Sequence, residues 1–495
     1  MLTQAGSSSE KSPQFTRRGG PLPRTPFSPA RQPIARPSPN LLTVRPLNDS
    51  YDIAIIGAGA AGLMAAIAAG RTARAAGAAS ASTSIILLDG ATTLGAKILV
   101  AGGGRCNVTH YAVDETAYAG SSRNAIKKVL RSYTVEQTVA FFEALGVQLK
   151  REETGKLFPT TDKARTVLYA LLDAAKAAGV HLFNPWRVDT ISRDDSGIFT
   201  ITRATALDAS PAAGPTTASS LRARAVILAP GGLSLPKSGS DGHGHTIARS
   251  LGHSITDRVF PSLVPLTIDR DFFTCALMGL AVPATLTVVS GTGKHLVSFT
   301  NSTLLTHFGL SGPGPLDISR YYTDAKRSDP AARLLMNFLP AFTTETLDAH
   351  LQKYTQPINR FLNQRPQALP DRLARALAEH AGVNPAQRPD QLPRELRRAL
   401  VTTITALPMP ITGDRGYTYA EVTAGGVPLS ELHLATMQSR LCPMLFLAGE
   451  LLDVDGRIGG YNFQWAWASG YLAGQAAAHA IAPPAPGLPP APAPA

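Results

Sequence analysis

A glycine-rich turn near residue 57 has the residue spacing of a dinucleotide phosphate site. Gly57, Gly59 and Gly62 follow the apolar run at 51–56 and precede a stretch of small residues. The first glycine permits a tight turn, the second lets backbone approach a pyrophosphate, and the third allows close packing of helix on strand. The N-terminus of the following helix offers N–H groups to the phosphates. A strand, glycine turn and helix in this order predict a bound dinucleotide.

An acidic residue at the end of the next apolar run is a second candidate ligand. Asp89 ends the sequence SIILLD, where such an acid hydrogen-bonds the ribose hydroxyls of adenosine. Asp89 lies 27 residues after Gly62, whereas the usual gap is about 20 residues. The excess falls in the Ala/Ser/Gly-rich stretch 70–83. The alternative interpretation is that Asp89 is a surface turn residue.

The glycine motif alone cannot distinguish FAD from NAD, and the distinguishing feature lies near the C-terminus. An apolar run at 445–448 leads into Gly449, then into the acids Asp453 and Asp455, and finally into GGYN at 459–462 and a helix. Two-domain flavoproteins use such a return of the chain to complete an extended FAD site. An acid holds the ribityl or pyrophosphate region, and the helix N-terminus faces the flavin N1–C2=O edge, where negative charge builds on reduction. The alternative is that both acids are solvated loop residues.

The elements that must position these residues alternate between strand and helix over residues 51–250. We expect strands at 51–56, 84–89, 199–203 and 223–229, and helices at 60–69, 134–145 and 166–178. Alternation of this kind builds a parallel or mixed layered sheet. The pattern then changes twice, because 262–305 is rich in β-forming residues and 343–406 is mostly helical. Residues 417–480 return to strand, loop and helix, with a long helix at 465–480.

Composition and charge exclude several classes of protein. The 495 residues are 44% hydrophobic and 17% charged, which is typical of globular proteins. No apolar run reaches the roughly 18 residues of a membrane-spanning helix. The three cysteines, Cys106, Cys275 and Cys442, form no CxxC pair, which argues against a disulfide framework and favours a cytoplasmic location. The net charge of +12 is spread along the chain and favours an anionic cofactor over nucleic acid.

Several longer stretches together resemble one family of bacterial flavoproteins. They are GAGAAGLMAA at 57–66, LGAKILVAGGGRCNVTH at 94–110, KLFPTTDKA at 156–164, LAPGGLSLPKSGSDGHGHTIARSLGH at 228–253, LLTHFGLSGPGPLDISR at 304–320, EVTAGGVPLSEL at 421–432, TMQSRL at 436–441 and LAGELLDVDGRIGGYNFQWAWASGYLAG at 447–474. The chain resembles the BaiN-type, or aminoacetone-oxidase-like, NAD(P)/FAD-dependent oxidoreductases from residue 51 to residue 480. The GGGRCN and GGYN blocks are specific to that family rather than generic to Rossmann folds.

This resemblance implies FAD as the cofactor and a set of residues that contact it. The implied pyrophosphate contacts are Gly57, Gly59, Ala61 and Gly62, the ribose contact is Asp89, and the adenine contact is the backbone of Val188. The residues implied along the cofactor and towards the flavin are Lys97, Gly104, Arg105, Cys106, Gly231, Gly449, Asp455, Gly460, Tyr461 and Asn462. The chain departs from the family pattern in the insertion at 70–83, at Pro230 and at His110.

The expected fold class is α/β, with a discontinuous Rossmann-like FAD-binding domain interrupted by an insert. By resemblance, the insert consists of a β-barrel and a small helical domain. The expected boundaries are a disordered tail at 1–50, the FAD-binding domain at 51–255 and 411–482, the insert at 256–410, and a Pro/Ala-rich tail at 483–495. Within the insert we expect the barrel at 256–340 and 400–416 and the helical part at 341–400.

No residue of the sequence is identified as the catalytic acid or base. The candidates are His307, which is a structural histidine if it does not face the flavin, Tyr461 beside the flavin, and Cys106, whose neighbours also suit a backbone cradle. His243 and His245 form an HxH pair without a placed acidic partner. This pair is more typical of a turn and helix cap than of a metal site, so we expect no metal.

The expected reaction is hydride transfer through flavin N5 between NAD(P)H and a small organic substrate that the sequence does not specify. We find no second strand–GxGxxG–helix unit, so NAD(P)H must dock transiently at the flavin. One alternative is an FAD-dependent RNA-modifying or RNA-binding protein, which the basic charge permits. The other is a non-catalytic flavin-binding protein. The oligomeric state is not indicated.

Overall fold

The computed structural model describes residues 47–76, 83–204, 218–366 and 368–482. The tail expected at 483–495, nearly all of the tail expected at 1–50, and residues 77–82 of the proposed insertion lie outside these ranges. Within the described part of the chain, no helix is both long and apolar enough to cross a membrane.

A mixed sheet carries the glycine-rich turn, and it has nine strands among the described residues. Its parallel strands lie in the order β22–β10–β1–β2–β7. Their bounds are Ser50–Ile56 for β1, Ile85–Leu88 for β2, His181–Phe183 for β7, Ser220–Leu228 for β10 and Leu445–Leu447 for β22. The strand order reverses between β1 and β10. Open α/β sheets bind ligands at the carboxyl ends of the strands at such a reversal.

Antiparallel strands extend this sheet and form small sheets beside it. In the main sheet, β9 (Phe199–Arg203) pairs with β10, and β8 (Val188–Arg193) pairs with β9. On the other side, β21 (Gln438–Ser439) pairs with β22, and β20 (Leu432–His433) pairs with β21. One small sheet consists of β3 (Thr109–His110), β6 (Lys156–Pro159) and β5 (Leu149–Arg151). A second pairs β4 (Tyr118–Gly120) with β23 (Val454–Gly456), and a third pairs β11 (Phe260–Ser262) with β19 (Val422–Ala424).

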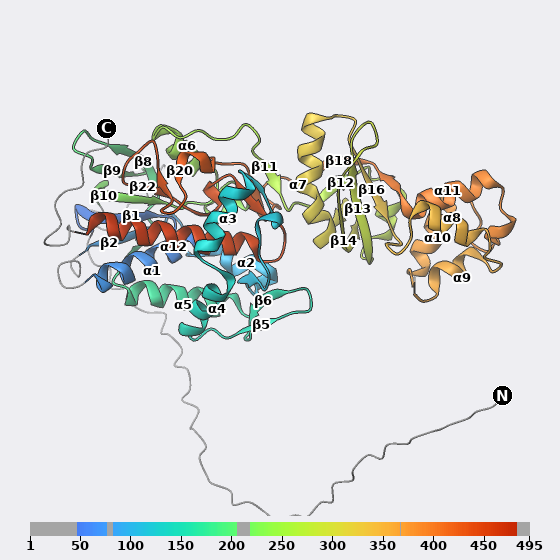
Figure 1. The fold of residues 1–495 in the computed structure, drawn as a ribbon, viewed down its shortest axis with the longest axis horizontal. Helices are drawn as coiled ribbons and strands as arrows, with labels where there is room; N and C mark the ends of the chain where they lie inside the picture. Colours follow the sequence, from blue (N-terminus) through green and yellow to red (C-terminus); the bar gives the residue numbers. More distant parts are fainter. Residues whose placement is uncertain (1–46, 77–82, 205–217, 367, 483–495) are drawn as a thin grey trace, which may run out of the picture. The chain divides into compact units, whose positions relative to one another are not determined.

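The longest helix, α12 (Tyr461–Ile481), lies alongside α1 (Ala60–Ala75) on one face of the main sheet (Figure 1). A Cβ atom at Gly470 would lie 2.4 Å from the carbonyl oxygen of Ala61, and one at Gly474 would lie 2.1 Å from that of Ala65. The two backbones therefore touch without side chains between them. The other helices of this part are α2 (Ala96–Gly104), α3 (Arg123–Ser132), α4 (Val135–Ala144), α5 (Ala164–Ala177) and α6 (His243–Ser250).

The insert holds an antiparallel sheet of seven strands in the order β17–β16–β13–β14–β15–β12–β18, counted over the described residues. The bounds are Leu266–Ile268 for β12, Ala281–Val289 for β13, His295–Thr306 for β14, Gly309–Ser311 for β15, Arg333–Asn337 for β16, Leu407–Met409 for β17 and Ile411–Asp414 for β18. The edge strands β17 and β18 are separated by Pro410 alone. Because consecutive Cα atoms are about 3.8 Å apart, the sheet must curl until its two edges lie together, as in a barrel.

Helices follow the strands of the insert and include one that was not expected. The helices α8 (Thr344–Leu351), α9 (Ile358–Asn363), α10 (Asp371–His380) and α11 (Arg394–Thr405) form the helical part. In contrast, α7 (Pro313–Ser328) lies within the region expected to be β structure and packs against β13 and β14. Its first turn contains Pro313 and Pro315, where the missing N–H groups cost no helical hydrogen bond.

Candidate functional site

A cavity of about 850 Å³ lies at the carboxyl ends of the parallel strands. Gly57 follows β1, Asp89 follows β2, Gly231 lies in the loop after β10 and Gly449 lies in the loop after β22, and all four line the cavity. The sequence therefore brings together residues that are up to 392 positions apart in the chain, from Gly57 to Gly449. The wall also includes Ala61, Lys97, Arg105, Val188, Gly460 and Asn462.

The glycine turn leaves space for phosphate next to the N-terminus of α1. Gly57 has φ +98°, and a Cβ there would lie 2.4 Å from the carbonyl oxygen of Ala229. A Cβ at Gly62 would lie 1.8 Å from the carbonyl oxygen of Gly57. A Cβ at Gly59, in contrast, would have no atom within 4 Å, and Gly59 begins α1 without a side-chain cap. An open space at an uncapped helix N-terminus fits a pyrophosphate.

The Asp89 carboxylate is held against the glycine turn. Its Oδ2 accepts a hydrogen bond from Ala58 N at 2.6 Å, and its Oδ1 accepts one from Ala91 N at 2.7 Å. Burial is the largest effect on this carboxyl group and raises the pKa of Asp89 above its ordinary value. Asp89 is therefore not a solvated surface turn residue.

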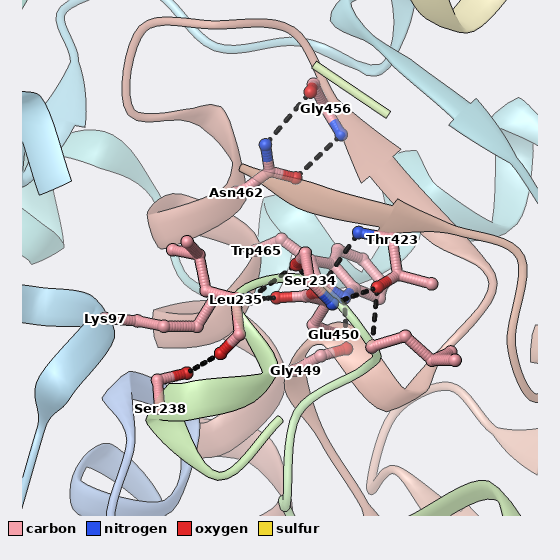
Figure 2. Close-up of polar contacts among 11 residues, drawn as sticks. Lys97, Ser234, Leu235, Ser238, Thr423, Gly449, Glu450, Gly456, Asn462 and Trp465 are labelled. Carbon is pink, nitrogen blue, oxygen red and sulfur yellow. Dashed lines mark hydrogen bonds and ion pairs between the residues drawn. The ribbon is translucent and has the colours of Figure 1, made fainter. Parts of the chain in front are cut away.

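A cluster of hydrogen bonds around Glu450 joins four segments at the cavity (Figure 2). Lys97 Nζ of α2 lies 2.5 Å from Glu450 Oε2 and donates to Ser234 Oγ at 2.8 Å. Ser234 Oγ donates to Glu450 Oε1 at 2.6 Å, and Thr423 N of β19 donates to the same oxygen at 3.1 Å. Thr423 Oγ1 in turn accepts from Leu233 N at 2.7 Å and from Ser234 N at 3.0 Å. The cluster fixes the ends of β10, β19 and β22 relative to α2.

Lys97 was expected at the cofactor, whereas Glu450, Ser234 and Thr423 were not identified from the sequence. The sequence offered one signal for Glu450, which is its position directly after Gly449 at the end of an apolar strand. Ser234 and Thr423 gave no signal, because their roles depend on contacts between segments far apart in the chain.

A second helix N-terminus, that of α12, also reaches the cavity. Gly460 begins this helix with φ +95° and no side-chain cap, and a Cβ there would lie 2.6 Å from the carbonyl carbon of Thr109. Asn462 accepts from Gly456 N at 2.8 Å and donates to the carbonyl oxygen of Gly456 at 2.9 Å, as Figure 2 shows. Trp465 Nε1 donates to the carbonyl oxygen of Gly449 at 3.1 Å. These bonds fix the start of α12 at the cavity, where a helix N-terminus can stabilise negative charge.

Two of the candidate catalytic residues require correction. Cys106 is fully buried, does not line the cavity, and burial raises the pKa of its thiol to about 12. A protonated, enclosed thiol cannot act as a catalytic group at the cavity. His307 is exposed in the turn between β14 and β15 and also lies outside the cavity wall.

Four other expected residues lie behind the wall rather than on it. Gly62 packs against Gly57, and Gly104 ends α2 next to the wall residues Gly103 and Arg105. Tyr461 stacks on His110 with 4.9 Å between ring centroids.

Asp455 also lies behind the wall, and its side chain points towards the insert. Its Oδ2 accepts from Ser262 Oγ at 3.1 Å and from Arg320 Nε at 3.2 Å. Only 3% of Asp455 is exposed, so it is not a solvated loop residue.

The split Rossmann-like fold, the open glycine turn and the two uncapped helix N-termini define the class of an FAD-dependent oxidoreductase. The chain belongs to the HI0933-like family, whose Rossmann domain matches residues 51–476. Both the expected family and the expected α/β fold class are confirmed.

The chain aligns with nearly the whole length of two relatives of known name. The chain is 32% identical over 429 residues to the ribosomal RNA dihydrouridine synthase of Escherichia coli (strain K12), covering 86% of this chain and 98% of that protein. It is 31% identical over 435 residues to the 3-dehydro-bile acid delta(4,6)-reductase of Clostridium scindens, with coverage of 86% and 98%. A solved 3-ketosteroid-delta4-(5alpha)-dehydrogenase from Rhodococcus jostii RHA1 aligns at 16% identity and a TM-score of 0.42, covering 88% of this chain and 98% of that one.

Proposed function

We propose that the protein takes electrons from NAD(P)H and adds hydrogen to a carbon–carbon double bond of a small organic substrate. The observation that carries this proposal is that two relatives, each aligned with 86% of the chain, bear the names of a delta(4,6)-reductase and a dihydrouridine synthase. Both names denote the addition of hydrogen to a double bond. When bound, FAD supplies hydride transfer at flavin N5.

The residues of the cavity would hold and orient this cofactor. The backbone at Gly57, Gly59 and Ala61 would bind the pyrophosphate, Asp89 the ribose and the Val188 backbone the adenine. The N-terminus of α12 would stabilise negative charge at the flavin N1–C2=O edge, because its uncapped N–H groups reach the cavity.

NAD(P)H would dock transiently in the same cavity. Over the residues that the structure describes, the glycine-rich turn of β1 and α1 is the one strand–GxGxxG–helix unit. The cavity continues past the phosphate cradle to Leu263 and Tyr419. Its volume of about 850 Å³ lies within the range of about 300–1,000 Å³ that is usual for ligand pockets.

Anaerobic mixing of the FAD-loaded protein with NADH or NADPH tests the proposal. We expect bleaching of the flavin absorbance with at least one nucleotide, followed by reoxidation with a small substrate that has a carbon–carbon double bond. Failure of both nucleotides would contradict the assigned electron donor and leave a non-catalytic flavin protein as the better interpretation. A chain that binds no FAD after gentle purification would contradict the assignment of the cofactor.

RNA is the rival substrate, favoured by the name of the E. coli relative and by the net charge of +12. The small-molecule proposal expects no retardation of ribosomal RNA at physiological salt, where non-specific electrostatic binding is weak. Retardation together with NAD(P)H-dependent formation of dihydrouridine, detected by mass spectrometry of the RNA, would replace the small molecule with RNA.

A further inference from the structure

Most charged side chains on the cavity wall have a partner within the protein. Lys97 pairs with Glu450, Arg105 with Glu152 at 2.6 Å, Arg187 with Asp241 at 2.7 Å and Arg457 with Asp317 at 3.0 Å, while Asp89 accepts backbone hydrogen bonds. These charged groups are therefore paired in contacts that stabilise the cavity wall.

Glu421 and Lys156 differ from the other charged groups. Neither side chain makes a hydrogen bond or ion pair with any residue of the described ranges, although both line the cavity. Lys156 is half-buried on β6, whereas Glu421 is exposed, and both residues line the cavity. Lys237 is exposed like Glu421 and also lines the cavity without a partner among the described residues.

The backbone fixes the direction in which Glu421 points. Glu421 directly precedes β19, and its own N–H donates to the carbonyl oxygen of Leu263 at 3.2 Å. Alternate residues of an extended segment share one face, so Glu421 and Thr423 point to the same side. Thr423 is bonded to the cluster around Glu450. Glu421 therefore lies on the cavity side, next to that cluster.

The charged groups that face Glu421 come from three elements. They are Lys156 of β6, Lys97 of α2 and Asp317 of α7. The two lysines lower the pKa of Glu421 and Asp317 raises it, but burial has the largest effect, and the pKa is raised above that of an ordinary glutamate. The carboxyl group therefore keeps its proton to a higher pH than it would in water.

We propose that Glu421 is the proton donor to the substrate, that Lys156 binds the substrate carbonyl oxygen, and that the substrate is an α,β-unsaturated carbonyl compound. This inference rests on the proposed function and adds a substrate class and two residue roles to it. In the reaction, hydride adds its two electrons to the β-carbon, and the π pair of the double bond moves to form an enolate. The Lys156 ammonium group hydrogen-bonds the enolate oxygen.

The proton balance is completed by Glu421. Its carboxyl O–H bond breaks, the proton bonds to the α-carbon, and the carboxylate regains a proton from water. The substrate has then gained one hydride and one proton, and the reductant is NAD(P)H, which is oxidised to NAD(P)⁺.

The first test measures protonation without turnover. Infrared difference spectra of the FAD-loaded protein, titrated with pH, are compared for the wild type, Glu421→Gln and the control Glu143→Gln, whose side chain is exposed on α4. We expect a protonated carboxyl band that titrates above the ordinary range of glutamate in the wild type and the control, and that is missing in E421Q. A band that persists unchanged in E421Q would overturn the role of Glu421.

The second test separates the two half-reactions. Flavin reduced by NADH or NADPH is reoxidised either by ferricyanide, which accepts electrons without protonation at carbon, or by unsaturated ketones from 2-cyclohexen-1-one to a 4-en-3-one steroid. General acid catalysis contributes about 100- to 10,000-fold. We therefore expect reoxidation by the ketone to slow by at least about 100-fold in E421Q, with partial recovery in Glu421→Asp, while reduction and ferricyanide reoxidation keep wild-type rates. Lys156→Met should weaken binding of the ketone, whereas Lys176→Met, an exposed control on α5, should not.

The outcomes distinguish the inference from the proposed function. A wild-type protein that reduces an unsaturated ketone as fast as E421Q overturns the inference alone. A wild-type protein that is reduced by NAD(P)H but reduces no unsaturated ketone also overturns the inference alone, whereas a protein that neither NADH nor NADPH reduces contradicts the proposed function.

Discussion

Gly59 and Gly62 occupy the same turn, yet the structure gives their missing side chains opposite surroundings. A Cβ at Gly59 would enter open cavity, whereas one at Gly62 would meet the Gly57 carbonyl oxygen at 1.8 Å. We predict that Gly59→Val folds normally and loses FAD. A steric penalty of about 3 kcal/mol corresponds to roughly 100-fold weaker binding. Isothermal titration of the deflavinated protein with FAD, together with its thermal melting temperature, measures both effects.

Gly62→Ala is the matched comparison for Gly59→Val. Its extra methyl group should lower the free energy of unfolding by about 1–3 kcal/mol, because close packing leaves no room for it. Gly59→Val protein that retains one FAD per chain would contradict the phosphate cradle.

Glu450 is the acceptor on which the polar cluster at the cavity depends. Its carboxylate accepts hydrogen bonds from Ser234 Oγ and Thr423 N and pairs with Lys97. We predict that Glu450→Gln lowers the free energy of unfolding of the FAD-free protein by about 1.5–3 kcal/mol, the range for hydrogen bonds to charged groups. Urea denaturation of E450Q, Lys97→Met and the double variant gives the coupling between the pair. Additive losses would show that the contact between Lys97 and Glu450 contributes nothing of its own.

Among the secondary-structure elements, α1 and α12 make the contact on which both halves of the cavity depend. One helix starts at the glycine turn and the other at Gly460, so their mutual distance sets the separation of the two uncapped N-termini. We predict that Gly474→Ala destabilises the fold by about 1–3 kcal/mol and also weakens FAD binding, although Gly474 does not line the cavity. Denaturation and FAD titration are both needed to see the two effects.

The control for Gly474→Ala is Gly413→Ala on β18. A Cβ there would lie 3.5 Å from Thr267 Oγ1, which is an ordinary contact. Loss of stability in G474A without any change in FAD affinity would mean that α12 can shift along α1 without moving its N-terminus.

Local patterns predicted several of these elements, because apolar periodicity and glycine stops act over short stretches of chain. The strand at 199–203 coincides with β9, and the helix at 134–145 corresponds to α4, which Thr134 caps. The helix expected at 465–480 begins four residues earlier, at Tyr461. Its start depends on Gly460 packing against Thr109, a contact between distant segments.

The residues of the candidate site also fall into two groups, those that a local motif predicts and those that depend on tertiary packing. Gly57, Gly59 and Asp89 could be placed at the cavity from spacing alone, since a motif at a strand end has a known geometry. The directions of Asp455 and Cys106, in contrast, are set by tertiary packing: Asp455 contacts Ser262 and Arg320 of the insert, and Cys106 is enclosed in the core. The sequence around Glu421 gave no signal for this residue. What distinguishes Glu421 is that its side chain makes no hydrogen bond or ion pair with the described residues, and only the tertiary structure shows this.

Across the whole chain, ion pairs connect the insert to the returning segment before α12. Asp317 of α7 accepts from Arg457 Nη2 at 3.0 Å and from Ile458 N at 2.8 Å, and Arg320 of the same helix contacts Asp455. Residues 457–460 line the cavity directly before α12. Contacts made by the insert therefore fix the part of the cavity wall that directly precedes α12.

We predict that Asp317→Asn lowers both the free energy of unfolding and the affinity for FAD. Asn cannot pair with Arg457, and the loss of a hydrogen bond to a charged group costs about 1.5–3 kcal/mol. Arg375→Gln, which removes an exposed pair with Asp371, should change stability little. Denaturation of both variants with and without FAD provides the measurement.

The pH dependence of this loss has a defined sign. Burial has the largest effect on Asp317 and raises its pKa in the folded protein, despite the opposing effect of Arg457. The folded protein therefore binds the proton more tightly than the unfolded chain does, and this group's contribution to stability is lost as the pH rises through the folded-state pKa. Asn does not titrate, so the difference in stability between wild type and D317N should be largest below the ordinary pKa of 3.8 and shrink as the pH rises through the folded-state pKa. A difference that instead grows with pH would mean that the attraction of Arg457 outweighs burial, and that the insert is held to the flavin site by a fully charged pair.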